Sequence, residues 1–315
     1  MSELIEILKS NGIEKYQVKE TSHFYLITGK CDGKFADDIE KRLKTTIISK
    51  DLNNIICASS AIIKDRTETN VDPEKSIQNW RIEECIDGTV LRLYHNNTKW
   101  YIATNNSYNG FNYWGDMKSN FSETFFKHTY SFIDYENLDT KYTYFFVYSS
   151  TLHNVIQYKK NVIYYVSRTD NSTFKVDYSN IPEIMIDRPH VYNFKTIQEI
   201  IDELSKTKSR GFIMKSQDRY EPFIKFDTSE FKTIEKLKGN RKNIYIAYVL
   251  LKNKEDKDIF KKYYNTINFD KTQQRFDEIY NKFKLSSDSP ILKTPETFID
   301  HLVKRKDSDI EKILF

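Results

Sequence analysis

The stretch EECIDGTVLRLYHNNTKWYIAT, residues Glu83–Thr104, has the clearest pattern in this chain. It contains two runs of β-branched and aromatic residues, Val90–Tyr94 and Trp100–Thr104, which are typical of strands. The polar segment His95–Lys99 lies between them and predicts a turn, so the two runs should form a hairpin. Asp87-Gly88 predicts another turn, at the end of a preceding strand.

Similar runs on both sides predict a mainly β segment from about Thr21 to Val166, followed by a strand pair around a polar loop. Thr196–Ser205 has apolar residues at helical spacing, and Leu4, Ile5, Leu8 and Ile13 predict an amphipathic helix over residues 1–17. The other predicted strands are Phe24–Ile27, Thr46–Ile48, Ile55–Cys57, Tyr142–Tyr148, Val162–Ser167, Gly211–Lys215 and Pro222–Phe226.

The pattern changes after about Gly239. Apolar residues then recur at helical spacing, and Thr294-Pro295 is typical of a helix N-cap followed by Pro in the first turn. We therefore expect two domains, residues 1–238 and a helical C-terminal subdomain of residues 239–315.

Composition excludes several classes of protein. The chain has 315 residues, of which 39% are hydrophobic and 15% aromatic, so it can bury a core and is not disordered throughout. No run of 18 apolar residues predicts a membrane span, and the N-terminus does not resemble a secretory signal. The three cysteines are too few and too dispersed for a zinc site or a disulfide framework, which favours a cytoplasmic location.

The net charge of +4 is too small to indicate a nucleic-acid partner by itself. Only 8 residues are Gly, whereas Asn, Lys, Ile, Tyr and Phe are frequent. This bias follows the codons of an AT-rich genome, such as those of many large DNA viruses. For a viral protein, the expected location is the host cytoplasm.

Glu83–Thr89 resembles the first signature of the covalent nucleotidyltransferases, which include RNA ligases, ATP-dependent DNA ligases and mRNA capping enzymes. Their pattern is Lys-x-Asp-Gly, and the Lys amine attacks the nucleotide α-phosphate. Other segments resemble further elements of phage-type RNA ligases, in the same order. These are Thr46–Ala61, Ile102–Asn105, Tyr144–Ile156, Ser209–Met214 and Phe223–Lys225.

The resemblance covers roughly residues 40–230. It implies an α+β fold, in which a mixed or antiparallel-sheet nucleotidyltransferase domain (an ATP-grasp-like ligase adenylation domain) precedes the helical C-terminal subdomain. It also implies a cleft lined by Glu83–Gly88 and the hairpin, with Gly211–Lys215 and Phe223–Phe226 on the facing wall.

Four functional positions of that family differ in this chain. Cys85 stands where the family has its nucleophilic Lys, and Val147 and Arg210 replace two glutamates. Phe223 replaces the first Lys of the last signature. We therefore expect no catalytic residue, no bound metal and no cofactor, and a site with degenerate catalytic motifs.

The substitutions favour binding of phosphate over catalysis on it. Mg²⁺ prefers carboxylate and phosphate oxygens, and a cation at Arg210 repels it. A guanidinium instead binds phosphate directly through its planar set of donors. The predicted ligand-binding residues are Asp87, Arg210 and Lys225, with a base stacked on Tyr94, Tyr101 or Trp114.

Simpler interpretations of these residues remain open. Cys85 could be a small core residue, Asp87-Gly88 could serve only the turn, and Arg210 could be a solvated charge.

Three functions are compatible with the sequence. The first is a catalytically inactive protein that binds RNA, at a 5′ end or an mRNA cap, or a nucleotide. The second is an active ATP-dependent RNA ligase with another nucleophile. The third is a structural subunit of a viral RNA-processing or translation complex. A protein partner would bind the C-terminal helices, and no membrane partner is expected.

Overall fold

The computed structural model describes residues 3–59, 61–68, 77–113, 119–151, 154–216, 222–286 and 294–314. These residues form two compact units. The first unit comprises the described residues up to Thr228, apart from 151–159. The second unit comprises the described residues of 151–159 together with Ser229–Leu314. Among the described residues, no helix is both long and apolar enough to cross a membrane.

The first sheet of the first unit has four antiparallel strands in chain order. They are β1 (Tyr16–Glu20), β2 (Phe24–Lys30), β3 (Ile47–Ser49) and β4 (Ile55–Cys57). Helix α1 (Glu3–Asn11) buries Leu4, Ile5 and Leu8 against this sheet, and α2 (Asp38–Lys41) lies between β2 and β3.

The N-terminal helix is shorter than the predicted span of residues 1–17. It ends at Asn11 because Gly12 has a φ of 82°, a left-handed conformation that residues with a Cβ rarely adopt. A 3₁₀ turn, Ile13–Lys15, follows and leads into β1.

The second sheet contains the predicted hairpin. Its strand order is β11-β10-β9-β7-β8, and all neighbouring strands are antiparallel. Asn96 pairs with Lys99, so the hairpin has a two-residue loop, and Asn97 in that loop has a φ of 56°. The strands are β7 (Thr89–Asn96), β8 (Lys99–Ala103), β9 (Tyr142–Ser149), β10 (Val162–Asp170) and β11 (Val176–Asp177).

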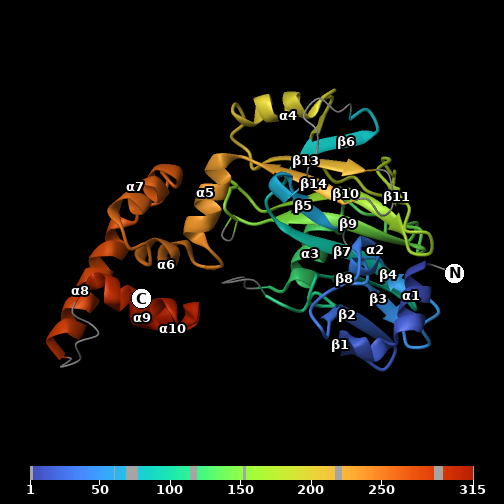
Figure 1. Cartoon of the computed structure of the whole chain (residues 1–315), viewed down its shortest axis with the longest axis horizontal. Coiled ribbons are helices and arrows are strands. Elements are labelled where there is room, and N and C mark those ends of the chain that lie inside the picture. The colour runs from blue at the N-terminus through green and yellow to red at the C-terminus, as the bar shows by residue number, and fades with distance from the viewer. Residues whose placement is uncertain are drawn as a thin grey trace. The chain divides into compact units, whose positions relative to one another are not determined.

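The third sheet has the strand order β12-β6-β13-β14-β5, and only β14 and β5 are parallel. Figure 1 shows α4 (Ile197–Leu204) above this sheet and the second sheet below it. Helix α3 (Phe121–Thr129) packs Phe125 on Phe146 of the second sheet. The strands are β5 (Ile63–Asp65), β6 (Trp80–Glu84), β12 (Val191–Tyr192), β13 (Gly211–Ser216) and β14 (Phe223–Asp227), and a 3₁₀ turn, Arg66–Glu68, follows β5.

The second unit is helical, as the sequence predicts, and has its own apolar core. Its C-terminal part begins at α5, ten residues before the predicted boundary at residue 239, because Phe231 and Ile234 of that helix are buried in this core. The predicted N-cap is present: the Thr294 hydroxyl accepts a hydrogen bond from the Thr297 N–H. The helices are α5 (Ser229–Lys238), α6 (Ile244–Val249), α7 (Lys254–Tyr263), α8 (Asp270–Ser286), α9 (Pro295–Val303) and α10 (Asp307–Leu314).

Candidate functional site

A cavity of about 490 Å³ lies between the second and third sheets. Its walls are largely apolar on the side of the second sheet, where Val90, Val147 and Val166 line it. The third sheet contributes most of the charged side chains. The charged lining residues are Arg42, Asp65, Glu84, Arg210, Lys215 and Lys225.

The alternation of side chains along the strands explains the charged wall. On β13, Phe212 and Met214 point into the core beneath α4, so Ile213 and Lys215 point to the opposite face. Ile213 pairs with Glu83 on β6 and with Lys225 on β14, which places both of these residues on the cavity face. The cavity face of this sheet therefore carries Glu83, Lys215 and Lys225 beside the apolar Ile213 and Phe223.

All four positions that differ from the nucleotidyltransferase pattern line this single cavity. They are Cys85, Val147, Arg210 and Phe223, and Lys225 lines it with them. They come from segments up to 140 positions apart in the chain, so only the fold brings them together.

The expected arrangement of the walls is wrong in one respect. Strand β6 pairs with β13, with Glu83 opposite Ile213 and Glu84 opposite Phe212. Glu83–Glu84 and Gly211–Lys215 therefore belong to the same wall, and the facing wall is formed by β7, β9 and β10. The pairing of β6 with β13 is not encoded by local periodicity, and for that reason the sequence pattern did not predict it.

Asp227 lies between the two cations that we expected to bind phosphate. The Arg210 Nε–H donates to Asp227 Oδ1 at 2.9 Å, and Lys225 Nζ lies 2.8 Å from Asp227 Oδ2. Arg210 Nη1 is also 3.8 Å from Asp87 Oδ1. The Asp227 side chain is only 1% exposed. Arg210 is thus not a solvated charge, because a buried carboxylate holds it within the site.

The Cys85 thiol is a poor nucleophile in this environment. Cys85 is 7% exposed and packs with Ile213 and Phe223, as the interpretation of a small core residue predicts. Burial raises the pKa of the thiol to about 11, although nearby Arg210 offsets part of the effect. The thiol is therefore protonated at neutral pH.

A second group of charges, which the sequence interpretation missed, is centred on Glu83. The buried Glu83 carboxylate contacts the Lys215 ammonium and accepts a hydrogen bond from Arg81 Nε at 2.5 Å. Burial lowers the pKa of Lys215 despite this pairing. The signal in the sequence was Lys215, a charged residue that directly follows the apolar run Gly211–Met214 in the same strand.

Gly88 serves more than the turn. A Cβ at this position would lie 2.5 Å from the carbonyl oxygen of Tyr148, which is closer than real contacts allow. The Ser149 hydroxyl also donates to the carbonyl oxygen of Asp87 at 2.8 Å. The Asp87-Gly88 segment is therefore packed directly on β9 at the edge of the cavity.

The expected stacking role of Tyr94 is wrong. Tyr94 is 1% exposed, its hydroxyl donates to the Tyr108 carbonyl, and its ring stacks on Tyr101 with centroids 5.7 Å apart. A base cannot reach a ring that is enclosed in the core. Tyr101 is partly buried in the same cluster and does not line the cavity, and Trp114 lies outside the described residues.

The Lys-x-Asp-Gly pattern does occur in this chain, at Lys30-Cys31-Asp32-Gly33, but in a different place. Lys30 ends β2 in the first sheet, and its Nζ lies 3.0 Å from the buried Glu40 carboxylate. Gly33 has a φ of 76°, and the segment forms a turn. None of these four residues lines the cavity between the second and third sheets.

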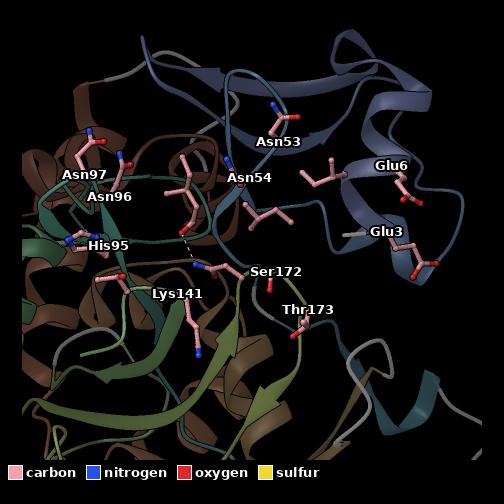
Figure 2. A pocket seen from close by; sticks show the side chains of 15 residues that line it. Glu3, Glu6, Asn53, Asn54, His95, Asn96, Asn97, Lys141, Ser172 and Thr173 are labelled. Carbon is pink, nitrogen blue, oxygen red and sulfur yellow. Dashed lines mark hydrogen bonds between the residues drawn. The ribbon is translucent and has the colours of Figure 1, made fainter. Parts of the chain in front are cut away.

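A larger cavity of about 950 Å³ lies elsewhere in the first unit (Figure 2). Glu3, Glu6 and Lys141 are its charged lining residues, and turns supply most of the uncharged polar ones, which include Asn53, Asn54, Asn96, Asn97, Asn171, Ser172 and Thr173. It contains none of the four substituted positions, Cys85, Val147, Arg210 and Phe223. We therefore place the candidate site in the smaller cavity.

Comparisons with known proteins support the fold. The sequence matches no protein-family model and no curated protein. The structure is similar to one from Aquifex aeolicus described as a "putative ATP-dependent DNA ligase", with a TM-score of 0.50 and 11% identity over 90% of this chain and 80% of that chain. An archaeal ATP-dependent RNA ligase is also similar, with a TM-score of 0.46 and 10% identity over 98% and 84%. This chain therefore has the α+β fold of the ATP-dependent ligases, with antiparallel sheets and C-terminal helices.

Proposed function

We propose that the chain binds a nucleotide or the 5′ end of an RNA in the cavity between the second and third sheets, without forming a covalent bond to it. One observation carries this proposal. Cys85, Val147, Arg210 and Phe223 are the positions at which the chain lacks the catalytic groups of the nucleotidyltransferases, and all four line one cavity.

The lining residues are better suited to binding than to transfer. The Cys85 thiol is protonated at neutral pH, and the acids nearest to Arg210, Asp87 and Asp227, are both ion-paired with it. The described residues contain no group of three or more His, Cys, Asp or Glu that could hold a metal ion. This set of residues does not fit a Mg²⁺ site, which would need carboxylate oxygens.

The cavity instead suits a ligand with an aromatic base and a phosphate. Its valine and phenylalanine side chains can contact a base, and Arg210 and Lys225 can bind a phosphate. Asp227 competes with the phosphate for both cations, because its carboxylate already pairs with them. A cap-like nucleotide is a specific version of this ligand, since capping enzymes share the signature pattern.

The ion pairs of Asp227 with Arg210 and Lys225 predict opposite effects of two substitutions on RNA binding. Arg210→Ala should weaken binding of a 5′-phosphorylated RNA by roughly 10- to 100-fold, because charge-assisted hydrogen bonds to phosphate are lost. Asp227→Asn should strengthen it, because the competing negative charge is removed. Fluorescence anisotropy with capped, 5′-triphosphate, 5′-monophosphate and 5′-hydroxyl RNAs measures both.

Lys99→Ala is the matched control, since Lys99 is an exposed cation at the start of β8 in the same unit. It should leave binding unchanged. If all of the RNAs bind equally and neither cavity variant differs from Lys99→Ala, recognition of the 5′ end in this cavity is wrong.

One observation favours a second candidate, an active nucleotidyltransferase. The Lys215 amine lines the same cavity, and burial lowers its pKa, which increases the neutral fraction of the amine. Incubation with α-labelled ATP or GTP and Mg²⁺, followed by denaturing electrophoresis, separates the two candidates. We expect no labelled protein. A label that forms in good yield and disappears in Lys215→Arg would support the enzyme.

A further inference from the structure

The helical unit contains all of the net positive charge of the chain. Residues 229–315 have 19 Lys and Arg against 14 Asp and Glu, whereas the rest of the chain has 30 against 31. The net charge of +4 therefore arises from the helical segment, which suggests an anionic partner for this unit.

A cavity of about 610 Å³ in this unit is lined by three cations, Arg241, Lys242 and Lys306. Arg241 and Lys242 lie on one side of it, between α5 and α6, and Lys306 lies on the other, between α9 and α10. Lys304 and Arg305 directly precede Lys306 and are exposed. Three cations from two distant segments thus line one hollow, and two more directly precede Lys306 in the chain.

Arg241 joins the two segments. Its guanidinium donates to the carbonyl oxygens of Val303, at 2.7 Å, and Arg305, at 3.2 Å, and pairs with Asp307 at 2.8 Å. The Asp307 carboxylate also accepts the Lys242 backbone N–H at 2.8 Å. These contacts keep the basic residues together without a ligand.

The two acids that line the cavity already have structural partners. Asp307 binds Arg241 and the Lys242 backbone, and Glu311 accepts a hydrogen bond from the Asn243 side chain at 3.0 Å. Both carboxylates therefore contact the segment Arg241–Asn243, between α5 and α6. Lys242 and Lys306, both exposed, are the cations best placed to meet a ligand, and the Ser308 hydroxyl lies beside them.

We propose that this basic groove, formed by Arg241, Lys242 and Lys306–Ser308, binds the phosphate backbone of single-stranded RNA. The proposal rests on the proposed function in one respect, the choice of RNA as the polyanion. Contacts to phosphates alone carry no sequence information and do not depend on the chemistry of the 5′ end. The groove would therefore add affinity for the strand, whereas the cavity between the sheets would recognise its end.

The experiment compares two double variants by fluorescence anisotropy over a series of KCl concentrations. Lys242→Ala/Lys306→Ala removes two cations from the groove. Lys271→Ala/Lys284→Ala removes two exposed cations from α8 of the same unit and is the matched control. The probes are one labelled single-stranded RNA with a 5′-phosphate and the same RNA with a 5′-hydroxyl.

We expect the groove variant to bind both RNAs more weakly, by the same factor. The slope of log K against log [KCl] should become shallower by about 1.4, or about 0.7 for each lost phosphate contact to a single strand. The control should keep the slope of the unmodified chain. Equal slopes and affinities for the two double variants would overturn the groove proposal.

The two proposals fail in different ways. If the two RNAs bind equally but the groove variant still loses salt dependence, recognition of the 5′ end fails and the groove remains. If the RNAs differ but the groove variant matches the control, the groove proposal fails alone. If the unmodified chain binds anionic phospholipid vesicles but neither RNA, the groove proposal is overturned in favour of a lipid surface.

Discussion

A single buried carboxylate, Asp227, sets the electrostatics of the candidate site. It pairs with Arg210 and Lys225 and is almost inaccessible to water. Two cations that share one acid present less net charge than two solvated cations, so the carboxylate lowers the affinity of the site for a phosphate. Any phosphate that enters must compete with this carboxylate, and for this reason we expect Asp227→Asn to strengthen binding.

Cys85 provides a test of the site at the scale of one residue. Because burial raises the pKa of its thiol to about 11, alkylation of Cys85 by iodoacetamide should be slow at pH 7 and should accelerate as the pH rises toward 11. Cys31 is exposed and should react first. Mass spectrometry of the digested protein reports each cysteine separately.

A nucleotide bound in the cavity should further slow the alkylation of Cys85 and leave that of Cys31 unchanged. Rapid modification of Cys85 at neutral pH would contradict the buried, protonated thiol. It would also reopen a covalent role for this residue.

At the scale of elements, Glu40 in α2 connects α1, β1 and β2. Its carboxylate accepts hydrogen bonds from the Tyr16 hydroxyl at 2.7 Å and the Asn11 amide at 3.2 Å, and it pairs with Lys30. Burial alone would raise the pKa of Glu40, but hydrogen bonds from the Ala36 N–H, Tyr16 and Lys30 outweigh it and lower the pKa.

Glu40 should therefore make stability depend on pH. A carboxyl group whose pKa is lowered in the folded state stabilises the fold at pH values above its pKa in the unfolded state, which is about 4.3 for Glu. This contribution is lost as the pH falls through the pKa of the folded state. Glu40→Gln should lower the free energy of unfolding at pH 7 by about 1–3 kcal/mol and by less at low pH. Urea unfolding at several pH values measures the difference.

The exposed Glu136→Gln is the control for this substitution and should change stability little at any pH. If Glu40→Gln has the same small effect as Glu136→Gln, the hydrogen bonds to Glu40 do not stabilise the first unit. The pairing of Lys30 with Glu40 would then not account for the Lys-x-Asp-Gly match at Lys30–Gly33.

At the scale of the whole molecule, charge and shape are divided between the two units. The first contains three sheets, the cavity and almost equal numbers of acids and bases. The second is helical and contains the positive excess. A calculation of net charge for the whole chain conceals this division, and the small total of +4 therefore does not exclude a polyanionic partner.

The sequence by itself determined the local elements and their order. Strands such as Val90–Tyr94, a hairpin turn within His95–Lys99 and the Thr294 N-cap follow from periodicity and turn chemistry within a few residues. The ordered signature-like segments indicated the ligase fold. They also identified Cys85, Val147, Arg210 and Phe223 as positions of one site, which the structure brings together in one cavity.

Only the tertiary structure decided what surrounds these residues. The structure places Asp87-Gly88 at the edge of the cavity and Asp32-Gly33 in a turn elsewhere. It also buries Tyr94 in the core and pairs Arg210 with Asp227. It also placed β6 beside β13, more than 120 residues away in the chain. Strand pairing and ion pairing depend on the register of distant segments, and local propensity has no information on that register.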